Sequence, residues 1–224
     1  MSDRKPHHYP GAALTVTYDA GLCIHAGECV RGLPQVFDPQ EKPWVKPDAA
    51  SAEEIATVVA RCPSGALAIA QPAAATATAG AAAAPAPVVA TVVANGPLLL
   101  KGELEVLDAD GNVLKRDAKA ALCRCGASAN RPFCDGSHKS CGFADAGVAG
   151  AISLRNEPET VTSPLLRLRV RPNGPVVAEG WLTIVDAAGQ EVVTGTRATF
   201  CRCGASANKP LCDGSHNRIG FTAP

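Results

Sequence analysis

Two stretches of this chain share one pattern of soft donor side chains: Cys123-Arg-Cys125-Gly-Ala-Ser-Ala-Asn-Arg-Pro-Phe-Cys134-Asp-Gly-Ser-His138 and Cys201-Arg-Cys203-Gly-Ala-Ser-Ala-Asn-Lys-Pro-Leu-Cys212-Asp-Gly-Ser-His216. Each stretch places three thiols and one imidazole at the same spacing. Donors of this kind, so close together, are typical of a metal centre. The pattern therefore predicts two similar metal sites with these ligands: Cys123, Cys125, Cys134 and His138; and Cys201, Cys203, Cys212 and His216.

The repeat extends beyond these stretches. A gapless shift of 78 residues places residues 95–143 (the first copy) on residues 173–221 (the second copy) with 25 identities. A match of this length indicates two copies of one fold. Alternating apolar runs precede each metal loop, so each copy is predicted to be a small antiparallel β unit followed by the loop and one helical turn. Asp135 is expected to N-cap that turn, which would bring Cys134 and His138 to one face.

Composition favours small modules over one large core. Only 4% of the 224 residues are aromatic, and metal binding can contribute the folding free energy that packing does not. Lys+Arg and Asp+Glu number 21 each, so no net charge favours nucleic acid or an anionic membrane. The polar N-terminus lacks a signal peptide's apolar core, and prolines and glycines interrupt the apolar residues 73–100. We therefore expect a soluble, cytoplasmic protein.

Ten cysteines in a reducing compartment are more typical of metal ligands than of disulfides. Six belong to the two repeated stretches, and Cys23, Cys29 and Cys62 form a third group. Cys141 remains, and Ile219 is its counterpart in the second copy. We interpret Cys141 as a buried or idle thiol.

The N-terminal region shows mixed secondary-structure signals. Residues 1–10 are predicted to be a flexible tail, Leu14 to Tyr18 alternates as a strand does, and Trp44-Val45 suggests a short strand. Ser51 and Glu54 form a capping-box pattern that starts a helix running into Cys62-Pro63.

Two cysteines in a loop and a distant Cys-Pro after a helix resemble half of a bacterial ferredoxin, although Ala26 replaces the middle ligand. Residues 18–69 resemble the divergent single-cluster 4Fe-4S family. The resemblance implies a 3Fe-4S cluster, or a 4Fe-4S cluster whose fourth iron takes His25, water or another ligand. The alternatives are a surface role for His25, and structural zinc or free thiols for Cys23, Cys29 and Cys62.

The pattern C-x-C-x2-S-x3-P-x-C-D-G-S-H is complete in both copies and resembles the CDGSH iron–sulfur family, which includes mitoNEET-like proteins. The resemblance implies one 2Fe-2S cluster per copy, with Cys123 and Cys125 on one iron and Cys134 and His138 on the other. Cys201, Cys203, Cys212 and His216 match them in turn. Zinc is the alternative, although zinc loops more often use C-x2-C. Family members pair two modules about a twofold axis, so we expect a pseudo-twofold pair within one monomeric chain.

These observations predict an α+β protein of small iron–sulfur modules. A divergent ferredoxin-like domain occupies residues 11–70, an Ala/Pro linker residues 71–87, and the two CDGSH modules residues 88–145 and 146–224. One histidine in place of a thiolate should raise the reduction potential and make it depend on pH.

The chain shows no nucleotide-binding loop, flavin fingerprint or nucleophile–base set, so we expect no enzyme. The first hypothesis is one-electron transfer between the N-terminal cluster and the two 2Fe-2S clusters. The second is a cluster donor or a redox or pH sensor, and a third is reduction of a small substrate at the position left open by Ala26. The expected partner is a redox protein or an apo-protein acceptor, with no nucleic acid and no membrane.

Overall fold

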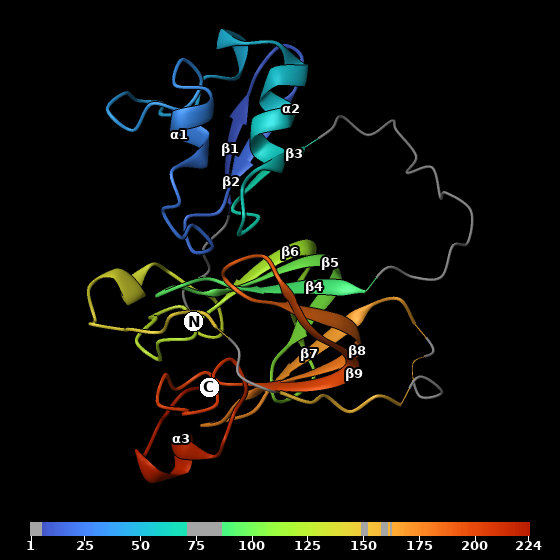
Figure 1. Ribbon diagram of the computed structural model, residues 1–224. Helices are drawn as coiled ribbons and strands as arrows, with labels where there is room; N and C mark the ends of the chain where they lie inside the picture. The colour runs from blue at the N-terminus through green and yellow to red at the C-terminus, as the bar shows by residue number, and fades with distance from the viewer. Residues whose placement is uncertain (1–5, 71–86, 149–151, 158–160, 162) are drawn as a thin grey trace. The chain divides into compact units, whose positions relative to one another are not determined.

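A computed structural model shows two compact units, which we call the N-terminal unit (Met1–Ala81) and the C-terminal unit (Ala82–Pro224) (Figure 1). The structure describes residues 6–70, 87–148, 152–157, 161 and 163–224. The linker predicted at residues 71–87 lies outside the described residues, apart from Pro87. Over the described residues, no helix has the length and apolar character needed to cross a membrane.

The N-terminal unit contains a three-stranded antiparallel sheet in the order β1 (His7–Pro10), β2 (Thr15–Tyr18) and β3 (Leu67–Ala70). β2 confirms the alternation predicted there, with Val16 fully buried. The predicted tail is wrong for residues 7–10, because β1 pairs with β2 from His7 opposite Tyr18 onward. The sequence pattern did not reveal β1, because the side chains of this strand are largely exposed and show no apolar alternation. Backbone hydrogen bonds with β2 stabilise it instead.

Three short helices accompany this sheet: α1 (Glu28–Gly32), the 3₁₀ helix η1 (Pro47–Ala49) and α2 (Ala52–Ala60). The predicted capping box is confirmed at α2. The Glu54 amide donates to Ser51 Oγ at 3.3 Å, and the Ser51 amide donates to Glu54 Oε2 at 3.0 Å. The strand predicted at Trp44-Val45 is only an isolated bridge between Phe37 and Val45.

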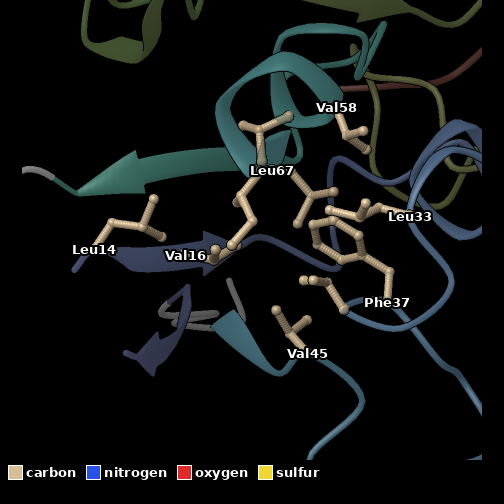
Figure 2. Close-up of a cluster of buried hydrophobic side chains, with 10 residues drawn as sticks. Leu14, Val16, Leu33, Phe37, Val45, Val58 and Leu67 are labelled. Carbon is tan, nitrogen blue, oxygen red and sulfur yellow. The ribbon is translucent and has the colours of Figure 1, made fainter. Parts of the chain in front are cut away.

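Apolar side chains from the sheet, the helices and the loops form one core in the N-terminal unit (Figure 2). Val16, Phe37 and Ile55 are fully buried in it. Cys29 and Cys62, two of the predicted ligands, pack against its margin. The apolar core therefore positions these cysteines from one side.

The C-terminal unit contains one six-stranded sheet. The first copy supplies β4 (Val88–Val92), β5 (Leu98–Leu107) and β6 (Val113–Leu122), and the second supplies β7 (Leu166–Val170), β8 (Val176–Val185) and β9 (Glu191–Phe200). The three strands of each copy pair antiparallel. Two short turns follow the metal loops, the 3₁₀ helix η2 (Ser137–Lys139) and α3 (Ser215–Arg218).

The two copies are joined through their first strands, each of which pairs with a strand of its own copy and with a strand of the other copy. β4 lies parallel to β8, with Val88 opposite Leu182, and β7 lies parallel to β5, with Leu166 opposite Leu104. These two pairings become identical when one copy is shifted onto the other, so the strand pattern has the pseudo-twofold relation that the sequence repeat predicted. Each copy therefore completes the sheet of the other.

Two features of this sheet were not evident from the sequence. β6 and β9 were not predicted, because their outer halves are largely polar and lack a buried alternation. β5 joins two of the alternating apolar runs, residues 98–100 and 104–107, in one continuous strand with a register shift between Lys101 and Leu104. Gly102 lies in that shift at φ 133, and an added Cβ there would come within 2.9 Å of Val88. Glycine therefore permits the bulge that keeps β5 intact beside β4.

Candidate metal centres

The first metal loop begins where β6 ends. The Cys123 amide donates to the Pro132 carbonyl and the Cys134 amide to the Ala121 carbonyl, both at 2.9 Å. These bonds form an isolated bridge between Leu122 and Phe133. They return the chain to the end of β6, so Cys134 lies close to Cys123 although eleven positions separate them in the sequence.

The four predicted ligands of the first copy lie in two pairs. The Sγ atoms of Cys123 and Cys125 are 3.6 Å apart, and Cys134 Sγ is 3.3 Å from His138 Nδ1. Two donors at each of two positions is the donor set that a two-iron cluster requires. The chemistry and the pairing of these side chains therefore fit the implied group.

The turn that carries His138 starts one residue later than predicted. Gly136, at φ 91, is the N-cap residue of η2, and Asp135 precedes it. Asp135 Oδ1 accepts hydrogen bonds from the amide and the hydroxyl of Ser137, while Oδ2 accepts one from the Ala129 amide. Asp135 therefore ties the turn to the middle of the metal loop, and the Gly136 amide donates to Cys134 Sγ at 3.4 Å.

The second copy repeats this geometry. Cys201 Sγ and Cys203 Sγ are 3.7 Å apart, and Cys212 Sγ is 3.3 Å from His216 Nδ1. The Gly214 amide donates to Cys212 Sγ at 3.4 Å. The two copies therefore present matching donor pairs on matching elements.

The arginine between the first two cysteines fixes each loop to its own sheet. Arg124 is 2% exposed, and its guanidinium donates to the backbone carbonyls of Val93 and Gly96 and to the carboxylate of Asp145. These acceptors lie in the β4–β5 turn and in the segment after η2. A buried guanidinium with three acceptors holds the C-x-C segment in position.

Arg202 does the same in the second copy. It donates to the backbone carbonyls of Arg171 and Gly174 and to the backbone oxygen of Pro224. Burial lowers the pKa of Arg202 to about 10, so it remains charged at neutral pH. Each metal loop therefore has a buried cation within two residues of its first cysteines.

The two metal loops contact each other through backbone atoms. A Cβ added to Gly126 would lie 2.5 Å from the Cys203 carbonyl oxygen, and one added to Gly204 would lie 2.5 Å from the Cys125 carbonyl oxygen. Both glycines have positive φ. Only glycine permits this approach, which brings a predicted ligand of each copy to the loop of the other.

The thiols and the imidazole of the first site have shifted proton affinities. The hydrogen bond shared by Cys123 and Cys125 lowers the pKa of Cys123 to about 6 and raises that of Cys125. Burial raises the pKa of Cys134 to about 11 and lowers that of His138. A neutral imidazole can ligate iron directly, whereas most of these thiols must lose their protons when metal binds.

In the N-terminal unit, Cys23, Cys29 and Cys62 line one small cavity of about 40 Å³. Ala26 also lines it, in place of the ligand that the ferredoxin pattern would supply. His25 is exposed and does not line this cavity. The three predicted cysteines therefore come together, whereas the structure directs His25 elsewhere.

Two further findings concern the cysteines and metal donors. All ten cysteines are described, and none forms a disulfide. Cys141, interpreted from the sequence as a buried or idle thiol, is exposed, so the buried alternative is wrong. Among the described residues, no three Cys, His, Asp or Glu side chains converge on a single metal-ion position.

Sequence reasoning missed two kinds of residue at these sites. The anchoring role of Arg124 and Arg202 could not be derived from the sequence, because their acceptors lie 21 to 31 residues away in the chain. Tyr18 was expected only as the end of a strand, although it lines the N-terminal cavity. Its position five residues before Cys23 was the available signal.

Comparison with family models gives two matches. A model described as "divergent 4Fe-4S mono-cluster" matches residues 9–72. A model described as "iron-binding zinc finger CDGSH type" matches twice, at residues 95–139 and 173–217. These ranges contain every cysteine and histidine placed in a site above.

Among curated proteins, the chain is similar to the uncharacterized protein YjdI of Escherichia coli strain K12. The two are 39% identical over 59 residues, which is 26% of this chain and 78% of YjdI. YjdI of Escherichia coli O157:H7 matches to the same extent.

Proposed function

Because this iron–sulfur chain belongs to the divergent 4Fe-4S mono-cluster family and carries two tandem CDGSH domains, we propose that it is a multi-cluster electron carrier. Its N-terminal unit would hold a 3Fe-4S or 4Fe-4S cluster and its C-terminal unit two 2Fe-2S clusters. When bound, such clusters supply one-electron redox centres.

The side chains assigned to these clusters are those that the structure brings together. Cys123 and Cys125 would hold one iron of the first 2Fe-2S cluster, and Cys134 and His138 the other. Cys201 and Cys203, with Cys212 and His216, would do the same in the second copy. Cys23, Cys29 and Cys62 would hold the N-terminal cluster.

The repeated arrangement of two donor pairs within one sheet carries this proposal. The pairs are held by backbone bridges, by Asp135 and by the buried Arg124 in the first copy. A site held rigidly on strand ends needs little rearrangement when charge changes, which suits electron transfer. The cations Arg124 and Arg202 would offset part of the negative charge that three thiolates and sulfide bring to each site.

Iron and sulfide analysis of the anaerobically purified chain, with electron spin resonance of oxidised and reduced samples, tests the assignment. The expected result is three clusters per chain that accept electrons reversibly without loss of iron. Cys134→Ser should remove one 2Fe-2S signal, whereas Cys141→Ser should leave all three. Full iron content in Cys134→Ser, or irreversible loss of iron on reduction, would count against the proposal.

A second candidate function is cluster donation or redox and pH sensing. It is favoured by the partial exposure of His138 and His216, which lets solvent protons reach the imidazoles. Incubation with an apo-ferredoxin tests it. A donor should transfer its 2Fe-2S clusters, and faster at mildly acidic pH than at pH 8, whereas a carrier should retain them at both.

We propose that the chain is not an enzyme. We also propose that its partner is either a redox protein or an apo-protein that accepts a cluster. The internal pairing of the two copies suggests a monomer, because β4 and β7 already occupy the positions that a second chain would fill. The cytoplasm suits ten cysteines without disulfides, because thiols stay reduced there.

A further inference from the structure

A recess of about 380 Å³ lies beside the second metal loop, and the proposed function assigns it no role. It reaches Cys212, one of the predicted ligands of the second copy. One wall of the recess is formed by residues 152–157, which we call the edge segment, and its floor by β9. A cavity of this volume can hold a small molecule. The recess therefore offers a binding position next to a predicted cluster ligand.

The main chain of the edge segment is attached to β9. Arg155 forms an isolated bridge with Arg197, and the Arg155 carbonyl accepts hydrogen bonds from the amides of Thr196 at 2.9 Å and Arg197 at 3.3 Å. Gly195 permits this close approach, because an added Cβ would come within 2.6 Å of the Leu154 Cβ. The wall of the recess is therefore part of the folded sheet.

The polar lining of the recess combines positive charge with hydrogen-bonding groups. Two guanidinium groups come from Arg155 and Arg197, and hydroxyl and amide groups come from Ser153, Thr199 and Asn208. None of the described residues that line the recess is acidic. Guanidinium groups bind carboxylates and phosphates through paired, charge-assisted hydrogen bonds. The lining therefore favours a small oxyanion.

The ion pairs that these two arginines already form are weak competitors. Arg155 Nη1 is 4.0 Å from Glu157 Oε1, and Arg197 Nη2 is 3.5 Å from Glu179 Oε1. The four side chains are 44 to 71% exposed, and exposed ion pairs contribute little free energy. A bound oxyanion can therefore replace either carboxylate at small cost.

A negative charge in this recess would lie next to Cys212, and charge of that sign disfavours the addition of an electron to a nearby centre. We propose that the recess binds a small oxyanion, a carboxylate or a phosphate, and thereby lowers the reduction potential of the second CDGSH cluster. The binding follows from the recess itself, whereas the effect on the potential rests on the proposed function, because it requires a cluster on Cys212.

Isothermal titration calorimetry of the loaded full chain with inorganic phosphate and, separately, with citrate tests the binding and distinguishes the two kinds of oxyanion. We expect saturable binding of at least one probe, and about tenfold weaker binding in Arg155→Gln and in Arg197→Gln, because each variant removes a charge-assisted hydrogen bond. Arg167→Gln is the matched control and should bind as the unmodified chain does. Arg167 is also an exposed arginine of the sheet, 3.7 Å from Glu105, but it does not line the recess.

Gly195→Ala tests whether the recess, rather than surface charge alone, binds the oxyanion. The added Cβ should displace the edge segment without removing a charge, so the affinity should fall at least as far as in the arginine variants. Unchanged affinity in Gly195→Ala would show that the recess is not the binding site.

Redox titrations with and without the bound probe test the effect on the potential, in variants that each retain one 2Fe-2S cluster. At saturation the potential should fall in Cys134→Ser, which retains the second cluster, and stay unchanged in Cys212→Ser, which retains the first. An unchanged potential in Cys134→Ser overturns this effect.

Two outcomes of the calorimetry overturn the binding: no saturable binding of either probe, or equal affinities in Arg155→Gln, Arg197→Gln and Arg167→Gln. Absence of any 2Fe-2S signal from the purified chain would instead refute the proposed function. Because calorimetry detects binding without that signal, the two failures are distinguishable.

Discussion

The two CDGSH copies share a donor geometry but differ in the third acceptor of the buried arginine. The sulfur pairs are 3.6 and 3.7 Å apart, and the sulfur–imidazole distance is 3.3 Å in both. Arg124 completes its hydrogen bonds on the carboxylate of Asp145, whereas Arg202 completes them on the backbone oxygen of Pro224. The buried arginine therefore has three acceptors in each copy, and the third can be either a side-chain carboxylate or a main-chain oxygen.

The difference changes the electrostatics around the two loops. Asp145 is 13% exposed, and Lys209 of the second copy lies 3.9 Å from it. The negative charge of Asp145 beside the first loop is thus balanced partly by Lys209 of the second copy. The residue of the second copy that corresponds to Asp145 is Ala223, which carries no charge. Near-identical metal loops can therefore form two sites of unequal stability, and the following experiments probe this inequality.

The largest effect is expected from Arg124→Ala. It removes three hydrogen bonds and leaves the poorly exposed Asp145 without its main counter-charge, at a cost of about 4 kcal/mol in unfolding free energy. Arg202→Ala also removes three hydrogen bonds but leaves main-chain oxygens, and no aspartate side chain, without a donor, and it should cost about 3 kcal/mol. Urea unfolding of the loaded chain, followed by cluster absorbance, measures both.

A matched double variant checks this reasoning. Adding Asp145→Ala to Arg124→Ala removes the orphaned carboxylate and should recover part of the loss. Equal costs for the two single arginine variants, with no recovery in the double variant, would show that the Asp145 charge does not matter.

His138→Cys and His216→Cys should each lower the potential of their own cluster by on the order of 100 mV, or about 2 kcal/mol for one electron. The added thiolate makes the site more negative and removes the imidazole nitrogen that can take a proton. Since protonation stabilises the reduced state, the native potential should rise as pH falls, and the variant's should not. Redox titrations at several pH values measure this, and unchanged potentials in both variants would contradict the role of histidine.

Gly126→Ala tests the contact between the two loops. Its Cβ would meet the Cys203 carbonyl oxygen at 2.5 Å, so we expect a loss of about 2 kcal/mol that also lowers iron retention in the second copy. Gly142→Ala is the control, because Gly142 also has a positive φ, of 70°, but an added Cβ meets nothing within 4 Å. It should cost about 1 kcal/mol from backbone strain alone. Similar losses in both variants would show that the loops are not coupled.

The smallest effect should come from the aspartates of the two turns. Hydrogen bonds from Ser215 and Ala207 hold the pKa of Asp213 well below its ordinary value, and the pKa of Asp135 is also lowered, although burial opposes the shift there. A depressed pKa contributes stability above the ordinary value of 3.8 that is lost as pH falls through the folded value. Asp213→Asn should therefore flatten the acid dependence of unfolding below pH 4 more than Asp135→Asn does. Acid titrations of loaded protein, monitored by circular dichroism, compare them, and an equal effect would contradict the ranking.

Local signals in the sequence predicted local structure well. The capping box at Ser51 and Glu54 lies within one turn, so the residues that form it are readable side by side. The alternation of β2 was visible because Val16 faces the core while its neighbours face outward. β1, β6 and β9 were missed, since these strands are held by backbone hydrogen bonds and present few buried side chains along much of their length.

The candidate sites divide in the same way. The pairs Cys123–Cys125 and Cys134–His138 follow from spacing, because two and four positions bring side chains together in a tight loop or one helical turn. The place of Tyr18 in the lining of the N-terminal cavity, by contrast, depends on where its strand ends, and the exposure of His25 depends on the path of its loop.

The sequence by itself determined the kind of donors, their spacing and their duplication. Only the tertiary structure decided that β4 and β7 each pair with a strand of the other copy, that Gly126 and Gly204 bring the two metal loops into contact, and that Arg124 and Arg202 reach different third acceptors. The physical reason is range: ligand spacing is set by a few consecutive torsion angles, whereas these contacts join backbone atoms tens of residues apart, whose hydrogen-bonding capacity is the same in nearly every residue.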